Sequence, residues 1–202
     1  LDLREVWQLL SGLLAGLLLF TAVVLIQWLL GAYTVNGVNP PAAALAALPI
    51  ALLPGVVEEL VFRGILHRII ESTLGTWLSL LITSLLFGFA HLANPGATIG
   101  GAAAIALEAG LMLGIAYTAT KRLWAPIGLH AAWNFAQGGV YGIAVSGVRT
   151  DGILRGQLSG PEMISGGAFG AEASIVAVIV CLAMFGVLLV RARRGGQMIA
   201  PF

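Results

Sequence analysis

The sequence predicts an all-α membrane protein: a polytopic transmembrane helical bundle of about six spans, with broken or re-entrant helices around an intramembrane cavity. Of its 202 residues, 59% are apolar and only 9% are charged, whereas an average soluble domain carries about 25% charged residues. A helix needs roughly 20 apolar residues to cross a bilayer, and about six such runs are present. Ionisable residues inside these runs indicate a polar cavity, because isolated charges in hydrocarbon are costly.

Proline-containing breaks separate the predicted spans, since proline lacks a helix donor and restricts the preceding residue. The spans are Val6–Tyr33, Ala42–Ile70, Thr76–His91, Thr98–Thr120, Pro126–Val145 and Ala171–Val190. The first is much longer than the apolar core of a signal peptide, so we expect a transmembrane helix. The second is too long for one crossing and contains Pro49 and Pro54, which predicts a break and a fresh helix near Pro54.

We expect one domain over residues 1–202, with its functional core in residues 54–145. Because residue 1 is Leu, we expect a fragment of a longer chain. The single Cys181 provides no disulfide framework. The net charge of +1 gives no reason to expect a nucleic-acid partner. Glycine pairs such as Gly12 with Gly16 and Gly110 with Gly114 are interpreted as tight helix packing.

The distribution of basic residues predicts the orientation in the membrane. The loops at residues 34–41 and 92–97 carry no charge, whereas the helix ends on the same side of the membrane as the two chain termini are basic. By the positive-inside rule, both termini face the cytoplasm. The basic residues concerned are Arg4, Arg68, Lys121, Arg122, Arg191, Arg193 and Arg194.

The first polar group in the apolar runs contains two adjacent carboxylates and an arginine. Glu59 and Arg63 are four residues apart, so they share a helix face and can pair. Glu58 is rotated by about 100° from Glu59. This spacing predicts a structural ion pair of Glu59 with Arg63, and leaves Glu58 available for chemistry. A purely structural ion pair is the simpler alternative.

Two histidines and an asparagine form the second group. His91 closes an apolar run, while His130 and Asn134 lie one helical turn apart on one face. Imidazole and amide groups can both donate to an oxygen that develops negative charge. Taken alone, His91 is equally consistent with an interfacial residue.

Glu108 lies near the centre of the fourth run, where an acid usually has a functional or network role. Its candidate partners are Arg63 and the two histidines. It either balances Arg63 or faces a substrate cavity. His67, Arg68 and Glu71 are interpreted as an interfacial cluster.

The ordered set Glu58-Glu59-x-x-x-Arg63, Phe87-x-x-x-His91 and His130-x-x-x-Asn134 resembles the CPBP family, which includes the CAAX proteases and the bacteriocin-processing or Abi proteins. The resemblance implies an intramembrane endopeptidase of the plasma membrane that acts on a hydrophobic or lipidated peptide. It implies that Glu58 and His91 activate water and that His130 and Asn134 stabilise the oxyanion. Short loops and many glycines look more like bacterial members. Residues 160–172 resemble those members more weakly.

The metal requirement and two other function classes stay open at this stage. Glu58, His91 and His130 could hold zinc, which takes three protein ligands and water in catalytic sites. No His-Glu-x-x-His motif is present, and Asn134 suits oxyanion binding, so we expect no required metal. A non-catalytic immunity or peptide-binding protein of the same fold is the main alternative. A small transporter or proton relay is the third.

A simple six-span arrangement would place His91 and His130 roughly 20–30 Å apart, because a helix rises 1.5 Å per residue. The peptidase hypothesis therefore requires helices that begin or end within the membrane, and the candidates are Pro49–Gly55 and Asn94–Gly101. We predict that Glu58, His91, His130 and Asn134 converge on one site.

Overall fold

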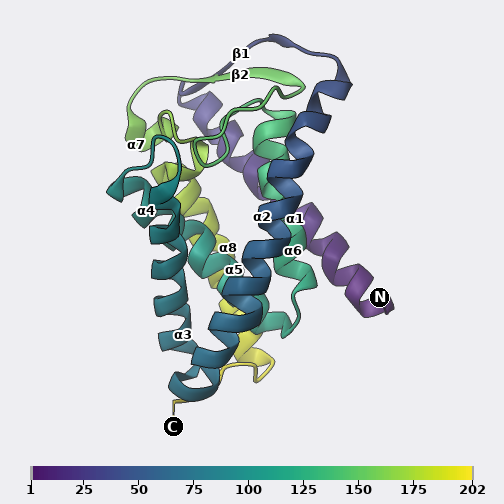
Figure 1. Ribbon diagram of the computed structural model, residues 1–202, viewed down its shortest axis with the longest axis vertical. Helices are drawn as coiled ribbons and strands as arrows, with labels where there is room; N and C mark the ends of the chain where they lie inside the picture. Colours follow the sequence, from purple (N-terminus) through teal and green to yellow (C-terminus); the bar gives the residue numbers. More distant parts are fainter. Residues whose placement is uncertain (1, 202) are drawn as a thin grey trace.

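A computed structural model describes residues 2–201 as a bundle of helices with a two-stranded sheet at one end (Figure 1). Within these residues, four helices are long and apolar enough to cross a membrane: Leu3–Leu29, Pro41–Ala93, Ile99–Thr120 and Ile175–Arg194. The predicted all-α membrane bundle is therefore confirmed, and the number of spans remains approximate.

The chain passes through helices of three types. The first half contains α1 (Leu3–Leu29), β1 (Tyr33–Val38), the 3₁₀ helix η1 (Pro41–Ala47), α2 (Leu48–Glu59), the π-helical η2 (Leu60–His67), α3 (Arg68–Ala90) and the 3₁₀ turn η3 (His91–Ala93). The second half contains α4 (Ile99–Ile105), the π-helical η4 (Ala106–Gly110), α5 (Leu111–Thr120), α6 (Trp124–Phe135), the π-helical η5 (Ala136–Val140), β2 (Leu154–Leu158), α7 (Glu162–Ser165), the 3₁₀ turn η6 (Ala171–Ala173) and α8 (Ile175–Arg194).

The helical stretch from Pro41 to Ala93 folds back on itself at Gly75. Gly75 has φ +76°, and a Cβ there would lie 2.7 Å from the backbone nitrogen of Pro201. The position therefore requires glycine. After this turn, α3 packs against η2 (Figure 1).

The predicted fresh helix near Pro54 is wrong. Pro54 lies inside α2, and the change from 3₁₀ to α geometry occurs earlier, at Leu48. Pro49 occupies the first turn of α2, where its missing N–H needs no partner. The other candidate break is present, because α3 ends before His91 and a new helix begins at Ile99.

Glycines bring α1 and α6 into close contact. A Cβ on Gly12 would lie 2.2 Å from the carbonyl oxygen of Ala125, and one on Gly16 would lie 2.2 Å from that of Leu129. Gly128 approaches α1 in the same way from the other side. The interpretation of the Gly12–Gly16 spacing as tight packing is confirmed.

Both ends of the described chain lie at one end of the bundle. Arg122 pairs with Asp2 and Glu5 near the start of the chain. The backbone N–H of Thr76 donates to the carbonyl oxygen of Ile199, at 3.0 Å, near the end of the chain. This basic end of the bundle therefore holds both chain ends.

The opposite end carries features that the sequence did not predict. β1 and β2 pair antiparallel, with Tyr33 opposite Leu158. Tyr33, which was predicted to close the first span, lies in the strand, and its hydroxyl donates to the carbonyl oxygen of Tyr141.

Candidate active site

The predicted ion pair of Glu59 with Arg63 is formed and is fully buried. Arg63 Nη1 donates to Glu59 Oε1 at 2.9 Å, and Nη2 donates to the carbonyl oxygens of Ala109 and Gly110, both at 3.1 Å. The guanidinium also lies 4.5 Å from the centroid of the Phe87 ring. Arg63 thus joins η2 to the end of η4, where the helix changes from π to α geometry.

Glu59 also orients His130. The Nδ1 atom of His130 lies 2.9 Å from Glu59 Oε1, the oxygen that accepts from Arg63. A carboxylate paired with a guanidinium only accepts hydrogen bonds, so His130 carries a proton on Nδ1. The Nε2 atom of His130 is therefore the ring nitrogen that remains available to a bound water or substrate.

His91 is oriented in a similar way by its own helix. Its Nδ1 atom lies 2.8 Å from the carbonyl oxygen of Phe87. A carbonyl oxygen can only accept, so Nδ1 carries the proton and Nε2 presents a lone pair in the neutral ring. The Phe87 ring lies 4.8 Å from the ring of His91 and 6.1 Å from that of His130.

His91, His130 and Asn134 line one small cavity of about 20 Å³. A polar cavity of about 10–15 Å³ can hold one water molecule, so there is room for one here. Asn134 is 7% exposed, and its side-chain amide makes no hydrogen bond within residues 2–201. Three polar groups from two helices thus face a space the size of a water molecule.

His91 and His130 are not separated as they would be in a bundle of six full spans. The α6–η5 segment runs only from Trp124 to Val140, which is shorter than a full crossing, and His130 lies six residues after its start. α3 ends at Ala90, which brings His91 to the same level. Shortened helices therefore unite the two motifs.

Glu58 is the one predicted catalytic residue that does not line this cavity. Its Oε2 atom is buried and has no hydrogen-bond partner within residues 2–201. Phe62 and Phe87 pack edge to face across the antiparallel helices, with ring centroids 5.0 Å apart. Glu58 lies four residues before Phe62 and His91 four residues after Phe87, so each lies about one helical turn from this aromatic pair.

Glu108 lines the cavity and does not contact Arg63. Its Oε2 atom accepts a hydrogen bond from the Cys181 thiol at 3.3 Å. The prediction of a cavity-facing acid therefore agrees with the structure, whereas a direct balance of Arg63 is wrong, because Arg63 is occupied by Glu59 and two carbonyl oxygens.

Two polar residues of the cavity, Ser146 and Glu172, were not predicted from the sequence. Ser146 has φ +45°, and both its backbone N–H and its hydroxyl donate to Glu172 Oε1. Burial raises the pKa of Glu172, which lies in η6 before α8, to about 7. An acid among small residues was the only sequence signal for Glu172, and Ser146 gave none.

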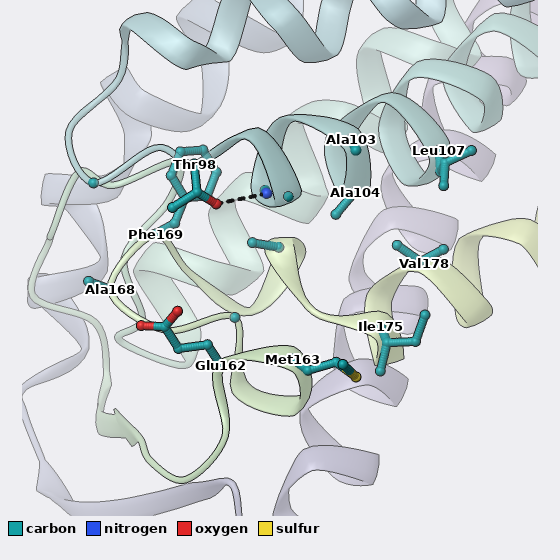
Figure 2. Close-up of a pocket in the computed structure, with 15 residues that line it drawn as sticks. Thr98, Ala103, Ala104, Leu107, Glu162, Met163, Ala168, Phe169, Ile175 and Val178 are labelled. Carbon is teal, nitrogen blue, oxygen red and sulfur yellow. Dashed lines mark hydrogen bonds between the residues drawn. The ribbon is translucent and has the colours of Figure 1, made fainter.

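An apolar groove of about 420 Å³ adjoins the cavity. Figure 2 shows Ala104 and Leu107 along one side of it and Met163, Ile175 and Val178 along the other, with Glu162 at one end. The neighbouring residues on the first helix, Ile105 and Glu108, line the cavity instead. One helix therefore separates the groove from the cavity.

The donor set does not fit a zinc site. Across residues 2–201, no group of three or more His, Cys, Asp or Glu side chains is placed to hold a metal ion. Glu58, His91 and His130 are therefore not arranged as a ligand set. The absence of a metal requirement stays a prediction.

Comparisons with known proteins bear on the family. Neither the comparison with curated proteins nor that with solved structures gave a match. Residues 40–136 match the family model for type II CAAX prenyl endopeptidase Rce1-like proteins, which is a protease family. This range contains Glu58, Glu59, Arg63, His91 and His130, together with Asn134. The match confirms the resemblance carried by the three motifs and is consistent with membership of the CPBP family.

Proposed function

We propose that the protein is an intramembrane endopeptidase that hydrolyses a peptide bond with water activated by Glu58 and His91. The observation that carries the proposal is the cavity itself. His91, His130 and Asn134 face a space for one water molecule, and their cavity-facing groups are free of protein partners. Such free polar groups are expected where a substrate or water binds.

The hydrogen bonds of the two histidines support different roles for them. The lone pair of His91 Nε2 can accept a proton from the attacking water, and the unpartnered Glu58 carboxylate is the second acceptor. The water oxygen attacks the carbonyl carbon, and its proton later passes to the leaving amine as the C–N bond breaks.

His130 and Asn134 stabilise the oxyanion of the tetrahedral intermediate. Asn134 donates from its amide N–H group. His130 already uses Nδ1–H for Glu59, so it donates from Nε2 only as the imidazolium. Removal of one oxyanion donor lowers kcat by about 10²–10³ in enzymes of known mechanism.

We further propose that the groove of Figure 2 receives an apolar segment of a hydrophobic or lipidated substrate. Leu107 and Ile175 are 45% and 44% exposed, so the groove opens on the lipid-facing surface of the bundle. No metal is required in this mechanism, and the basic end of the bundle faces the cytoplasm of a bacterium.

The test compares peptide cleavage by the purified protein and four variants reconstituted in vesicles, with a library of hydrophobic peptides. Glu58→Gln and His91→Ala should abolish cleavage, and Asn134→Ala should lower kcat by about 10²–10³. Asp151→Asn is the matched carboxylate control, because Asp151 is exposed and does not line the cavity. It should cleave like the unmodified protein.

Cleavage by Glu58→Gln at the unmodified rate would reject Glu58 as a base. Peptide binding without cleavage by the unmodified protein would favour the immunity or peptide-binding alternative. Retained cleavage after treatment with a chelator would support the metal-independent mechanism.

A further inference from the structure

A second large groove, of about 500 Å³, lies at the basic end of the bundle, away from the proposed active site. None of its lining residues lines the catalytic cavity. One wall is a stripe on α2, η2 and α3, and the other is formed by the end of α5 and the start of α6. The lining residues are Val56, Leu60, Gly64, Arg68, Tyr117, Lys121, Arg122, Leu123, Trp124 and Ile127.

The stripe changes from apolar to basic along its length. Val56, Leu60, Gly64 and Arg68 follow one another at intervals of four residues, so they share a helix face. Twelve residues of helix span roughly 18 Å. This length is close to half of the roughly 30 Å hydrocarbon thickness of a bilayer, which is the depth of one leaflet.

The basic end of the groove contains three cations and no acid. Lys121 pairs with Glu71, and Arg122 pairs with acids near the chain start, yet their side chains remain 31% and 36% exposed. Arg68 is exposed and forms no ion pair within residues 2–201. An anion placed here would meet one free guanidinium and two partly exposed cations.

A hydroxyl group without a protein partner also faces the groove. Tyr117 is only 8% exposed as a residue, and its hydroxyl makes no hydrogen bond within residues 2–201. Tyr117 lies beside the cations, where the headgroup or ester oxygens of a lipid would provide an acceptor.

The apolar part of the groove is open to surrounding lipid. Val56 and Leu60 are 39% and 46% exposed. Gly64 leaves room between the walls, since a Cβ there would lie 3.3 Å from Leu123 Cδ1. A side chain larger than methyl at position 64 would therefore fill the channel.

We propose that this groove binds an anionic diacyl phospholipid from the leaflet at the basic end. Its phosphate lies against Arg68, Lys121 and Arg122, and one acyl chain lies along Val56, Leu60 and Gly64. Basic pockets between transmembrane helices bind anionic headgroups by the same combination of charge and apolar contact. The proposal does not depend on peptidase activity.

Native mass spectrometry of the delipidated full chain tests the proposal, with phosphatidylglycerol and phosphatidylcholine of identical acyl chains as probes. We expect phosphatidylglycerol to bind at least roughly tenfold more tightly, since each nearby cation contributes about fivefold. Arg68→Gln should weaken phosphatidylglycerol roughly fivefold and leave phosphatidylcholine unchanged. Gly64→Leu should weaken both lipids.

Arg194→Gln is the matched control, because Arg194 is an exposed cation at the same end of the bundle and does not line the groove. It should bind both lipids like the unmodified protein. If Gly64→Leu does not fold, Tyr117→Phe replaces it and should weaken both lipids, because the phosphate and ester oxygens that accept from the hydroxyl are common to both.

Four results would overturn the proposal. The first is equal binding of the two lipids, and the second is an equal loss of phosphatidylglycerol affinity in Arg194→Gln and Arg68→Gln. The third is complete displacement of phosphatidylglycerol by inorganic phosphate. The fourth is displacement of phosphatidylglycerol by a hydrophobic peptide with a free C-terminal carboxylate but not by the amidated peptide. The last result would assign the groove to a peptide.

Discussion

The Glu59–Arg63 pair predicts strongly non-additive stability effects. Arg63 is 1% exposed and Glu59 is 0% exposed, so neither charge reaches solvent if its partner is removed. Arg63→Met leaves the Glu59 carboxylate uncompensated and also removes the donor to the carbonyl oxygens of Ala109 and Gly110. Glu59→Leu leaves the Arg63 guanidinium uncompensated and removes the acceptor of His130.

The magnitudes follow from these contacts. An uncompensated buried charge costs about 3–5 kcal/mol, and each lost hydrogen bond adds about 1 kcal/mol. We therefore expect Arg63→Met to lower the free energy of unfolding by about 5 kcal/mol, and Glu59→Leu by about 4 kcal/mol. The double variant buries no unpaired charge and should lose only about 2–3 kcal/mol.

The assay is equilibrium unfolding of the purified protein in mixed micelles, followed by tryptophan fluorescence during titration with sodium dodecyl sulfate. Arg193→Met is the control, because the exposed Arg193 forms no ion pair within residues 2–201 and its guanidinium lies 5.4 Å from the centroid of the Trp77 ring, so its loss should cost less than about 1 kcal/mol. If the double variant loses as much free energy of unfolding as the two single variants together, within about 0.5 kcal/mol, the reasoning is refuted.

Three other outcomes concern charge and packing. The pKa of Glu172 is raised from 4.5 to about 7, so between these pH values the folded protein retains a proton that the unfolded chain releases. The stability that is present below pH 4.5 is therefore reduced by about 3 kcal/mol as the pH rises through 7. Glu172→Gln should flatten this loss in thermal unfolding from pH 4 to 8, and an unchanged slope would contradict the assignment. Gly16→Ala should lower the free energy of unfolding by about 3 kcal/mol or more, because its Cβ would lie 2.2 Å from the carbonyl oxygen of Leu129. Gly186→Ala meets nothing within 4 Å inside α8 and should raise that free energy by up to about 1 kcal/mol, so equal effects of the two alanines would contradict the packing argument.

The spans with strong breaks at both ends could be predicted from the sequence. The predicted Thr76–His91 agrees with the part of α3 after Gly75, and Thr98–Thr120 agrees with Ile99–Thr120. The helix break predicted near Pro54 is absent, because a proline inside an apolar helix is tolerated when neighbouring groups satisfy the backbone. The strands and the π-helical segments left no local pattern, since they depend on contacts between distant parts of the chain.

The candidate site was predicted only where helical spacing determines the geometry. The i, i+4 spacing placed Glu59 with Arg63, and His130 with Asn134, on common faces. The union of His91 with His130 required shortened helices, whose extent no periodicity reveals. The hydrogen bond between Glu108 and Cys181 joins residues 73 apart in the sequence, and the one between Ser146 and Glu172 joins residues 26 apart. No helical spacing rule predicts contacts over such separations.

The π-helical segment η4 places one extra residue in a single turn of its helix, because π-helical hydrogen bonds run from residue i to residue i+5. Ile105 before this segment and Met112 after it both line the cavity. Deletion of one residue from Ala106–Gly110 would let the turn close as a regular α-helix and would keep the orientation of one half relative to the other. An insertion would instead rotate the two halves against each other by about 100°. This stretch should therefore tolerate a deletion better than an insertion.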